Sequence, residues 1–446
     1  MTAGRIWVVV ILLCLSACAP RADTALPAPA QTPAENAGLP AAGASGASSA
    51  APKSVKPEID ENTASESAGD VPEPEPEPEP VSVKLQLAGD ILLHSGPIRH
   101  ALTDGGAYDF RPYFELIAPY LDGDLSICNM EAPVDAFGDN KNLSTYPRFN
   151  SPYEILEALK WAGFDHLLTA NNHAFDKGEA GLEATVANIA RAGLGHTGTY
   201  LTPEARQTPS VIEVKGVNIG VAAYTDSCNG LESLIPAQRR AYAMNTFNSA
   251  RLDDLPAMAA DIGALRGAGA DIVIFALHWG AEYTDKPATA QRDIALALCE
   301  AGADIVMGGH SHSVQPIEWA DVTRADGSEA RCLIIYSLGN FFADQIGMNT
   351  PRPKTQYGML ADVTVTKSPG GQTAVEDCSV LATLSYRGRA SGGERYRLMP
   401  LDGFAPGLDE PADAPRPAFI PDDAALQWAN RAYAHVVRIV GADFVR

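Results

Sequence analysis

The sequence predicts a layered α/β fold, and three observations support this prediction. Short runs of β-forming residues alternate with stretches rich in Ala, Leu and Glu at helical spacing. Apolar residues make up 46% of the chain and charged residues 20%, so most of the chain can bury a core. No fixed repeat period occurs, which argues against solenoids and propellers. Strands and helices that alternate in this way pack as layers of helices on sheets.

The expected strands are short and mostly apolar. They cover residues 83–88, 125–128, 166–170, 217–223, 271–277, 304–307, 332–338 and 358–365. Helices are expected between many of them, at 153–162, 181–192, 255–267 and 289–301. Each of these helices is followed closely by a glycine, which is typical of a helix end. These glycines are Gly163, Gly193, Gly269 and Gly302.

The first residues predict export and attachment to a membrane. Arg5 precedes an apolar run at 6–13, and the chain then reads Leu15-Ser16-Ala17-Cys18. A positive start, a short apolar run and small residues describe a signal peptide. The ending resembles a bacterial lipobox, so residues 1–18 are interpreted as a lipoprotein signal with Cys18 lipidated. An ordinary signal peptide with a chance cysteine is the alternative. The expected location is extracytoplasmic, on a bacterial membrane held by the lipid anchor.

The rest of the chain divides into three parts by composition. Residues 19–81 are mainly Ala, Pro, Ser, Gly and Glu and end in a Glu-Pro repeat, so a disordered linker is expected. Residues 82–400 carry the strand and helix patterns and are expected to form one large domain. Residues 401–446 begin Pro-rich and then show an amphipathic helix near 422–440, expected to pack on the domain.

Charge and cysteine usage exclude several classes of protein. With 33 basic and 55 acidic residues, the formal net charge of −22 argues against nucleic acid as a partner. Beyond the signal region no long apolar run occurs, which excludes a polytopic membrane protein. Five cysteines follow Cys18 without any CxxC pair, so no thiolate zinc site is predicted.

Polar side chains cluster where the expected strands end. The first strand is followed by a carboxylate, the second by an amide and a carboxylate, and later ones by amides or imidazoles. In chain order these residues are Asp90, Asn129, Glu131, Asn171, Asn172, His173, His278, His310, His312 and Asn340. Because ligands of α/β sheets bind outside the carboxyl ends of the strands, these side chains are expected to converge on one crevice.

The chemistry of these groups suits a divalent metal. Carboxylate, amide oxygen and imidazole are ligands of Mn, Fe and Zn. His310 and His312 stand at i and i+2 beside two glycines, so both can face one point. Two ions about 3.5–4 Å apart, bridged by a carboxylate, would clamp both oxygens of a displacement at phosphorus. Singly, each group has another explanation: Asp90 could cap a helix, residues 171–173 could form a tight turn, and His278 could be a core histidine.

Six motifs in order resemble a known family. They are Gly89-Asp90, Asn129-x-Glu131, Asn171-Asn172-His173-x-x-Asp176-x-Gly178, His278-Trp279-Gly280-x-Glu282-Tyr283, Gly309-His310-x-His312-x-x-Gln315-Pro316 and Ser337-Leu338-Gly339-Asn340-Phe341. Over about residues 83–345 the series resembles the bacterial capsule synthesis protein CapA family, which is associated with poly-gamma-glutamate synthesis. That family is in turn similar to the calcineurin-like metallophosphatases. The resemblance therefore implies a four-layer α-β-β-α sandwich.

The resemblance also implies roles for individual residues. Two divalent ions, Mn, Fe or Zn, would be bound, with Glu131 as the bridging carboxylate. Asp90 and His312 would bind the first ion. The ligands of the second ion would be Asn172, His278 and His310. His173 would be the general acid for the leaving group, with Asp176 orienting its ring.

One motif departs from the metallophosphatase pattern, which begins Asp-x-His. Here Ile91 and Leu92 follow Asp90, and the nearest histidine is His94. The first ion is therefore expected to be held weakly, or by His94 after a turn. The residues expected to line the site or to add a ligand are His94, Asn129, Asn171, Glu282 and Asn340.

Three functions fit these patterns. The first is a surface hydrolase that uses metal to cleave a phosphoester or a related bond of the cell envelope. The second is a non-catalytic subunit of a machine that makes or exports poly-gamma-glutamate or another envelope polymer, with the polymer or its synthesis proteins as partners. The third is a lipid-anchored solute-binding protein. The His173 and Asp176 pair favours the hydrolase, since binding alone needs no acid.

Overall fold

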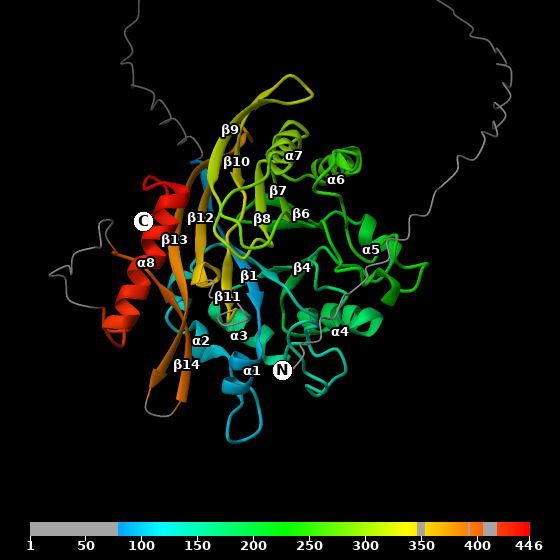
Figure 1. Cartoon of the computed structure of the whole chain (residues 1–446). Coiled ribbons are helices and arrows are strands. Elements are labelled where there is room, and N and C mark those ends of the chain that lie inside the picture. Colours follow the sequence, from blue (N-terminus) through cyan, green and yellow to red (C-terminus); the bar gives the residue numbers. More distant parts are fainter. Residues whose placement is uncertain (1–78, 346–352, 391–392, 405–416) are drawn as a thin grey trace, which may run out of the picture. The chain divides into compact units, whose positions relative to one another are not determined.

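Two β-sheets form the centre of the structure (Figure 1). This computed structural model describes residues 79–345, 353–390, 393–404 and 417–446. The predicted lipidation site at Cys18, the signal peptide and almost all of the linker lie outside the described residues. Within the described ranges, no helix is both long and apolar enough to cross a bilayer.

The larger sheet of the described chain has eight strands and is mixed. Its path is β14 (Gly393–Pro400), β13 (Thr373–Ala390), β12 (Tyr357–Lys367), β1 (Val81–Leu92), β2 (Leu125–Met130), β3 (His166–Leu168) and β4 (Gly195–Thr197), with β11 (Asn340–Ala343) also paired to β1. Strands β1 to β4 and β11 run parallel, whereas β12, β13 and β14 are antiparallel to their neighbours.

The smaller sheet has six strands. In order they are β5 (Val211–Val214), β6 (Val217–Thr225), β7 (Ile272–His278), β8 (Ile305–Gly309), β10 (Glu329–Ile335) and β9 (Ile317–Thr323). The four strands from β6 to β10 run parallel, and the two edge strands are antiparallel to them. Carboxyl ends of parallel strands thus lie along one edge of this sheet.

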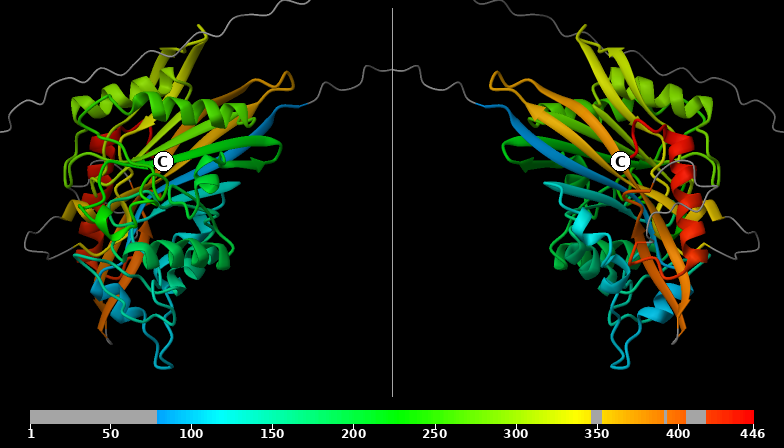
Figure 2. Two further views of the ribbon diagram at one scale, coloured as in Figure 1. Left: turned by 90° about the vertical axis from the view of Figure 1, so that its right-hand side faces the viewer. Right: turned by 90° about the vertical axis from the view of Figure 1, so that its left-hand side faces the viewer.

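Helices cover the outer faces of both sheets (Figure 2). The helices are α1 (Ser95–Ala101), α2 (Arg111–Phe114), α3 (Glu154–Ala162), α4 (Gly178–Arg191), α5 (Pro203–Gln207), α6 (Leu255–Gly267), α7 (Thr289–Glu300) and α8 (Asp423–Val440), with 3-10 turns at Ala118–Tyr120, Glu232–Leu234 and Pro353–Gln356. Residues of α1 to α4 pack on the larger sheet, and residues of α6 and α7 pack on the smaller one. The predicted four-layer α-β-β-α sandwich is confirmed. Helix α8 packs against β12 and β13.

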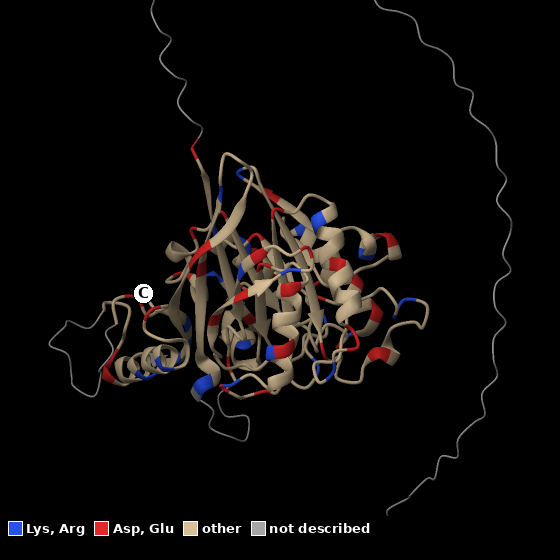
Figure 3. Ribbon diagram, turned by 90° about the horizontal axis from the view of Figure 1, so that it is seen from above, with Lys and Arg blue, Asp and Glu red and all other residues tan. Residues whose placement is uncertain are grey.

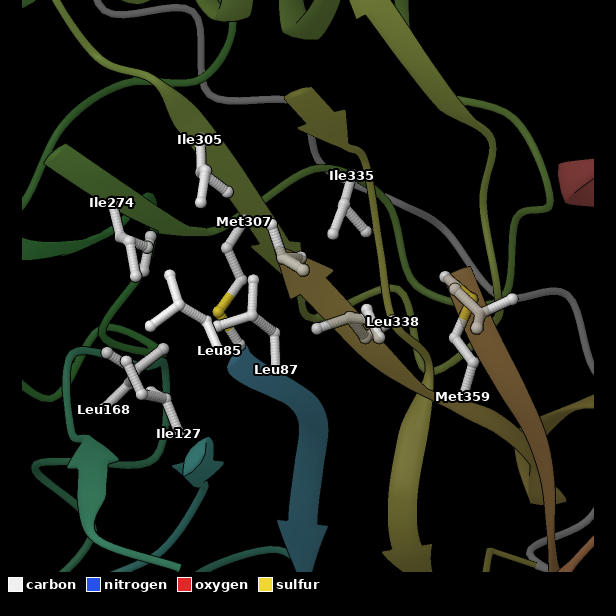
Figure 4. Packing of buried hydrophobic residues seen from close by; sticks show 14 of the residues in the cluster. Leu85, Leu87, Ile127, Leu168, Ile274, Ile305, Met307, Ile335, Leu338 and Met359 are labelled. Carbon is white, nitrogen blue, oxygen red and sulfur yellow. The ribbon is translucent and has the colours of Figure 1, made fainter. Parts of the chain in front are cut away.

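Successive side chains of a strand point to opposite faces of its sheet, and this alternation builds the layers. In β7, Ile272, Ile274 and Ala276 belong to the core between the sheets, whereas Val273 and Phe275 pack under the helices of the outer face. Figure 4 shows the packing between the sheets, where aliphatic side chains from β1, β2, β3, β7, β8, β10 and β12 meet. Burying one such side chain contributes about 1.5–3 kcal/mol. A register shift of one residue would therefore be costly on both faces.

Of the differences between the predicted and the observed strand boundaries, two change the setting of site residues most. The first strand does not end at residue 88; β1 continues to Leu92 past a bulge, so Asp90 lies inside it. The strand predicted at 332–338 ends at Ile335, and Asn340 begins the separate strand β11. Gly339, with φ of 69°, makes the turn between them. Strands β4, β5, β9, β11, β13 and β14 are not in the sequence prediction.

Candidate metal centre

The predicted site residues come together where strands of the two sheets end. In the larger sheet Asp90 stands beside Asn129 of β2 on one side and beside Asn340 of β11 on the other. In the smaller sheet His278, the last residue of β7, stands beside Gly309, the last residue of β8. Parallel pairing thus brings segments distant in sequence to one place, as the rule for α/β sheets predicts.

The turn after β8 has an unusual backbone. His310 and His312 have φ of 83° and 52°, in the left-handed region that disfavours residues with a side chain. Each such residue costs on the order of 1–3 kcal/mol, which the surrounding structure must offset. Gly308 allows a close approach, because a Cβ there would lie 1.9 Å from the carbonyl oxygen of Tyr336. The chain therefore holds two imidazoles in a strained turn against the end of the sheet.

One group of atoms that could bind a metal ion surrounds the imidazole of His278. Its Nε2 lies 3.0 Å from Asn172 Oδ1, 3.1 Å from His310 Nδ1 and 3.4 Å from Glu131 Oε1. Burial lowers the pKa of His278, and burial followed by the neighbouring imidazoles lowers that of His310. Both rings are thus neutral at pH 7 with lone pairs available. Glu131, His278 and His310 can hold a cation together.

A second group of possible metal-ligand atoms also includes Glu131. His312 Nδ1 lies 3.6 Å from Asp90 Oδ2, and His312 Nε2 lies 3.8 Å from Glu131 Oε1. Ligand atoms of Asp90, Glu131 and His312 all lie within 4.8 Å of one another, and all three residues are buried. Glu131 therefore belongs to both groups.

Glu131 supplies the test of whether a metal fits here. Its side chain is completely buried, and neither carboxylate oxygen has a hydrogen-bond partner among the described residues. Burial raises its pKa to about 8, and the neighbouring His312 acts in the opposite direction. A buried carboxylate without donors is costly unless a cation compensates it. Together with two adjacent groups of N and O ligands, this fits hard or borderline divalent ions.

Amide side chains fix the ligands in place. Asn129 donates from Nδ2 to Asp90 Oδ1 at 2.8 Å, and the same nitrogen lies 3.3 Å from His278 Nδ1. Asn171 donates in turn to Asn129 Oδ1 at 3.2 Å and to Met130 O at 2.9 Å. Asn129 and Asn171 therefore line the site with donor groups, and of the three amides in these strand ends only Asn172 presents its oxygen to the ligand atoms.

Asn340 fixes which ring nitrogen of His312 carries the hydrogen. Its Nδ2 donates to Gln345 Oε1 at 3.0 Å and to Thr355 O at 2.8 Å, so its Oδ1 faces His312 Nδ1 at 2.9 Å. An amide oxygen can only accept, and Nδ1 of His312 must then carry the hydrogen. The lone pair is left on Nε2, the nitrogen that faces Glu131. Asn340 thus acts through His312.

His173 stands beside the two groups without belonging to either. Its Nδ1 lies 2.8 Å from Asp176 Oδ2, and that oxygen also accepts from the Phe149 N–H at 2.6 Å. The Phe149 ring packs edge-on against His173, with ring centroids 4.7 Å apart. The side chain of His173 remains 9% exposed, whereas that of Asp176 is fully buried. His173 is therefore oriented with Nε2 available to a bound molecule.

His94 and Glu282 occupy different positions from the ligand groups. His94 is buried, its Nδ1 has no hydrogen-bond partner among the described residues, and its ring centroid lies 5.5 Å from that of Phe149. Burial lowers its pKa to about 4, with His312 and His173 contributing in the same direction. His94 therefore faces these two histidines but belongs to neither ligand group. Glu282 lies exposed in the loop after β7.

Sequence reasoning gave no role to three residues of this region. Asp226 follows β6 and accepts from the Gly280 N–H at 2.9 Å, which holds the chain just beyond His278. The rule used for the other strand ends would have found it. Tyr283 lies with its ring centroid 5.9 Å from that of His312, and Phe149 contacts His173. Nothing in their local sequence signals the positions of these two rings.

Comparison with solved structures gives matches of low similarity. A Haemophilus influenzae NAD nucleotidase aligns with 82% of this chain and 64% of its own, at 11% identity and a TM-score of 0.38. A novel phosphatase from Mycoplasma pneumoniae aligns with 68% of this chain and 94% of its own, at 14% identity and a TM-score of 0.38. Scores at this level do not establish a shared fold.

Comparison with characterised sequences gives closer matches. The PGA biosynthesis protein CapA of Bacillus subtilis is 31% identical over 258 residues, and the capsule biosynthesis protein CapA of Bacillus anthracis is 30% identical over 265. These matches cover 58% of this chain and 62% and 60% of the two relatives, so the chain spans about three-fifths of their length. The family model of the bacterial capsule synthesis protein PGA_cap matches residues 84–345, which hold all of the site residues named above. The chain belongs to the PGA_cap family of bacterial capsule synthesis proteins.

Proposed function

We propose that the protein is a metal-dependent hydrolase that cleaves a phosphoester or a related bond in the metabolism of a cell-envelope polymer. The observation that carries this proposal is the shared glutamate. Two groups of ligand atoms meet at Glu131, one with Asp90 and His312 and the other with His278 and His310. Two cations that share a carboxylate can stabilise both the attacking and the leaving oxygen of an in-line displacement at phosphorus.

The residues divide the chemistry between them. Asp90, Glu131 and His312 would hold one cation, and Glu131, His278 and His310, with the oxygen of Asn172, would hold the other. Divalent cations bound there would supply Lewis-acid chemistry, stabilising the negative charge that develops on the phosphoryl oxygens. A water molecule, made more acidic by the cations, would be the nucleophile. The remaining chemical requirement is a proton for the leaving oxygen.

His173 meets that requirement. Asp176 accepts the Nδ1 hydrogen of His173, which leaves Nε2–H of the protonated ring to donate to the leaving oxygen. The buried carboxylate of Asp176 stabilises the charged ring and fixes its orientation, while the Phe149 N–H fixes the carboxylate. A site that only binds a solute has no need of this pair, and for that reason hydrolysis is preferred to solute binding.

The names of the relatives support a place in polymer metabolism and also a second candidate. Beyond the CapA proteins, a Mycobacterium tuberculosis relative that is 32% identical over 204 residues is a probable polyglutamine synthesis accessory protein. An accessory protein need not be an enzyme. The second candidate is therefore a non-catalytic component of an envelope-polymer machine that keeps the metal centre for structure.

Replacing the proposed acid separates these candidates. His173→Ala should keep the metal content of the wild type but lose about 10²–10⁴-fold in turnover, because a general acid contributes that much. The loss should be smaller on an aryl phosphate with a good leaving group than on an alkyl ester. Metal analysis and steady-state kinetics on both substrates measure this, with His196→Ala in β4 as the control. Equal losses on the two esters would contradict the acid role, and no turnover by the metal-loaded wild type would favour the non-catalytic candidate.

Asn340 offers a test of the first cation site that does not need turnover. Asn340→Leu should weaken binding of Mn²⁺ or Zn²⁺ to the metal-free protein by about 10–100-fold, since partners that orient a ligand contribute that much. Calorimetric titration measures the affinity. Asn218→Leu is the matched control, because Asn218 lies near the start of β6, at the end of that strand away from the metal site. An unchanged affinity in a folded Asn340→Leu variant would remove Asn340 from the metal site.

The anchor is a separate proposal that rests on Cys18 and the residues before it. A Cys18→Ala variant should leave the membrane fraction and appear in soluble extracytoplasmic fractions, because no acyl chains would be attached. Fractionation of cells followed by immunoblotting measures this. If the variant stays with membranes after washing without detergent, the lipid anchor at Cys18 is wrong.

A further inference from the structure

The chain segment that follows β6 contacts two of the residues proposed to bind one cation. We call the cation that Glu131, His278 and His310 would hold the His278 cation. Thr225, the last residue of β6, pairs with His278 of β7, so the segment begins beside a proposed ligand. Acidic residues are spread over the ribbon in Figure 3, so charge alone does not single out Asp226, the first residue of the segment. The hydrogen bonds of Asp226 distinguish it.

Asp226 holds the turn that follows His278. Its N–H donates to the His278 carbonyl at 3.0 Å, and its Oδ2 accepts from the Gly280 N–H at 2.9 Å. Gly280 has φ of 86°, so the chain turns sharply at the point where the carboxylate holds it. Ser249 Oγ donates to the same carboxylate oxygen. The direction of the His278 side chain therefore depends on Asp226 as well as on the pairing of β7 with β8.

Asn229 contacts a second ligand of the same cation. Its backbone has φ of 52°, and its N–H donates to Ser227 Oγ at 3.0 Å. Its Oδ1 lies 3.5 Å from Nδ2 of Asn172. With its Nδ2 facing an acceptor, Asn172 presents Oδ1 to His278 Nε2 at 3.0 Å. Asn229 thus favours the amide orientation in which Asn172 can bind a cation through oxygen.

The ligands of the other cation are held by different residues. Asn129 Nδ2 donates to Asp90 Oδ1 at 2.8 Å, and Asn340 Oδ1 faces His312 Nδ1 at 2.9 Å. Among the described residues, no hydrogen bond joins residues 226–229 to Asp90 or His312. The segment after β6 therefore supports only one of the two groups of ligands.

We infer that Asp226 and Asn229 are positioning residues for the His278 cation and not for the other one. The inference rests on the proposed function, since it needs two cation sites that share Glu131. Neither residue contacts a cation or a substrate in this scheme, because Asp226 acts through His278 and Asn229 acts through Asn172. The two cation sites should therefore be open to separate weakening by substitution.

Asp271 provides a matched control for Asp226. It lies directly before β7, at the opposite end of the same two strands, and it makes a similar pair of bonds with Asn218 of β6. Its N–H donates to the Asn218 carbonyl at 2.8 Å, and its Oδ2 accepts from the Asn218 N–H at 2.8 Å. Removing either carboxylate should destabilise the same strand pair, but only Asp226 lies beside a proposed ligand.

Binding of Mn²⁺ to the metal-free protein tests the inference. Asp226→Ala should bind the His278 cation about 10–100-fold more weakly than the wild type, because partners that orient a metal ligand typically contribute that much. Affinity for the other cation should not change. At a Mn²⁺ concentration that just saturates the wild type, the electron paramagnetic resonance spectrum of Asp226→Ala should show isolated ions, whereas Asp271→Ala should keep the spectrum of a coupled pair. Calorimetric titration gives the affinities.

Further variants separate positioning from general damage to the fold. Asp226→Asn keeps an oxygen that can accept from Gly280 and Ser249, so it should bind the His278 cation more tightly than Asp226→Ala. Asn229→Ala changes an exposed residue and should weaken the same cation, which keeps the test available if Asp226→Ala does not fold. Asn248→Ala, at another exposed asparagine between β6 and α6, should leave both affinities unchanged.

The wild type and the variants together distinguish this inference from the proposed function. If the wild type never shows a coupled pair, both fail. If the wild type shows the pair, and Asp226→Ala and Asn229→Ala keep it at the same Mn²⁺ concentration, the two-cation centre stands and the positioning role fails. Equal weakening of both cations, an equal loss in Asp271→Ala, or an Asp226→Asn variant as weak as Asp226→Ala would also overturn the positioning role.

Discussion

The buried carboxylate of Glu131 is the constraint on which the rest of the site depends. It lies directly after β2, has no donor among the described residues, and is within reach of two separate groups of nitrogen and oxygen ligands. Removing a charge from water in this way costs several kcal/mol unless it is compensated. Hydrogen-bond donors compensate most buried carboxylates, as the N–H of Phe149 does for Asp176. For Glu131 only a cation from outside or a proton can do so.

The surrounding structure holds the ligands in place at a cost. His310 and His312 adopt positive φ, and Gly308 lies against the Tyr336 carbonyl at a separation that no side chain would allow. Such strain persists where the surrounding packing fixes the backbone. Here the packing is the core between the two sheets, which fixes the register of β7 and β8 and hence the places of His278 and the turn that follows Gly309.

Local composition made much of the fold predictable. The predicted helix at 255–267 has the observed bounds of α6, and short continuous apolar runs located β7 and β8 to within one or two residues. The hairpin of β13 and β14 was missed because charged residues interrupt its pattern, including Glu376, Asp377 and Arg387. Its apolar face is defined only by pairing with β12 and by the contact with α8.

The site itself was predictable because residue type and strand end coincide. What the sequence could not supply is how each side chain is used. Asn129, Asn171 and Asn340 occur in similar strand-end motifs, yet the structure shows that they act as hydrogen-bonding partners of Asp90, Asn129 and His312 respectively. The bulge in β1 that places Asp90 inside a strand depends on pairing with β2 and β11, which local sequence does not reveal.

Electron paramagnetic resonance of the manganese-loaded protein tests the central claim most directly. If Glu131 bridges two ions, Mn²⁺ added to the metal-free protein should give the spectrum of an exchange-coupled pair. Glu131→Gln should give uncoupled ions or a single bound ion, because the bridging oxygen charge is lost. A spectrum of isolated ions in the wild type, or a coupled spectrum that survives in Glu131→Gln, would contradict the account.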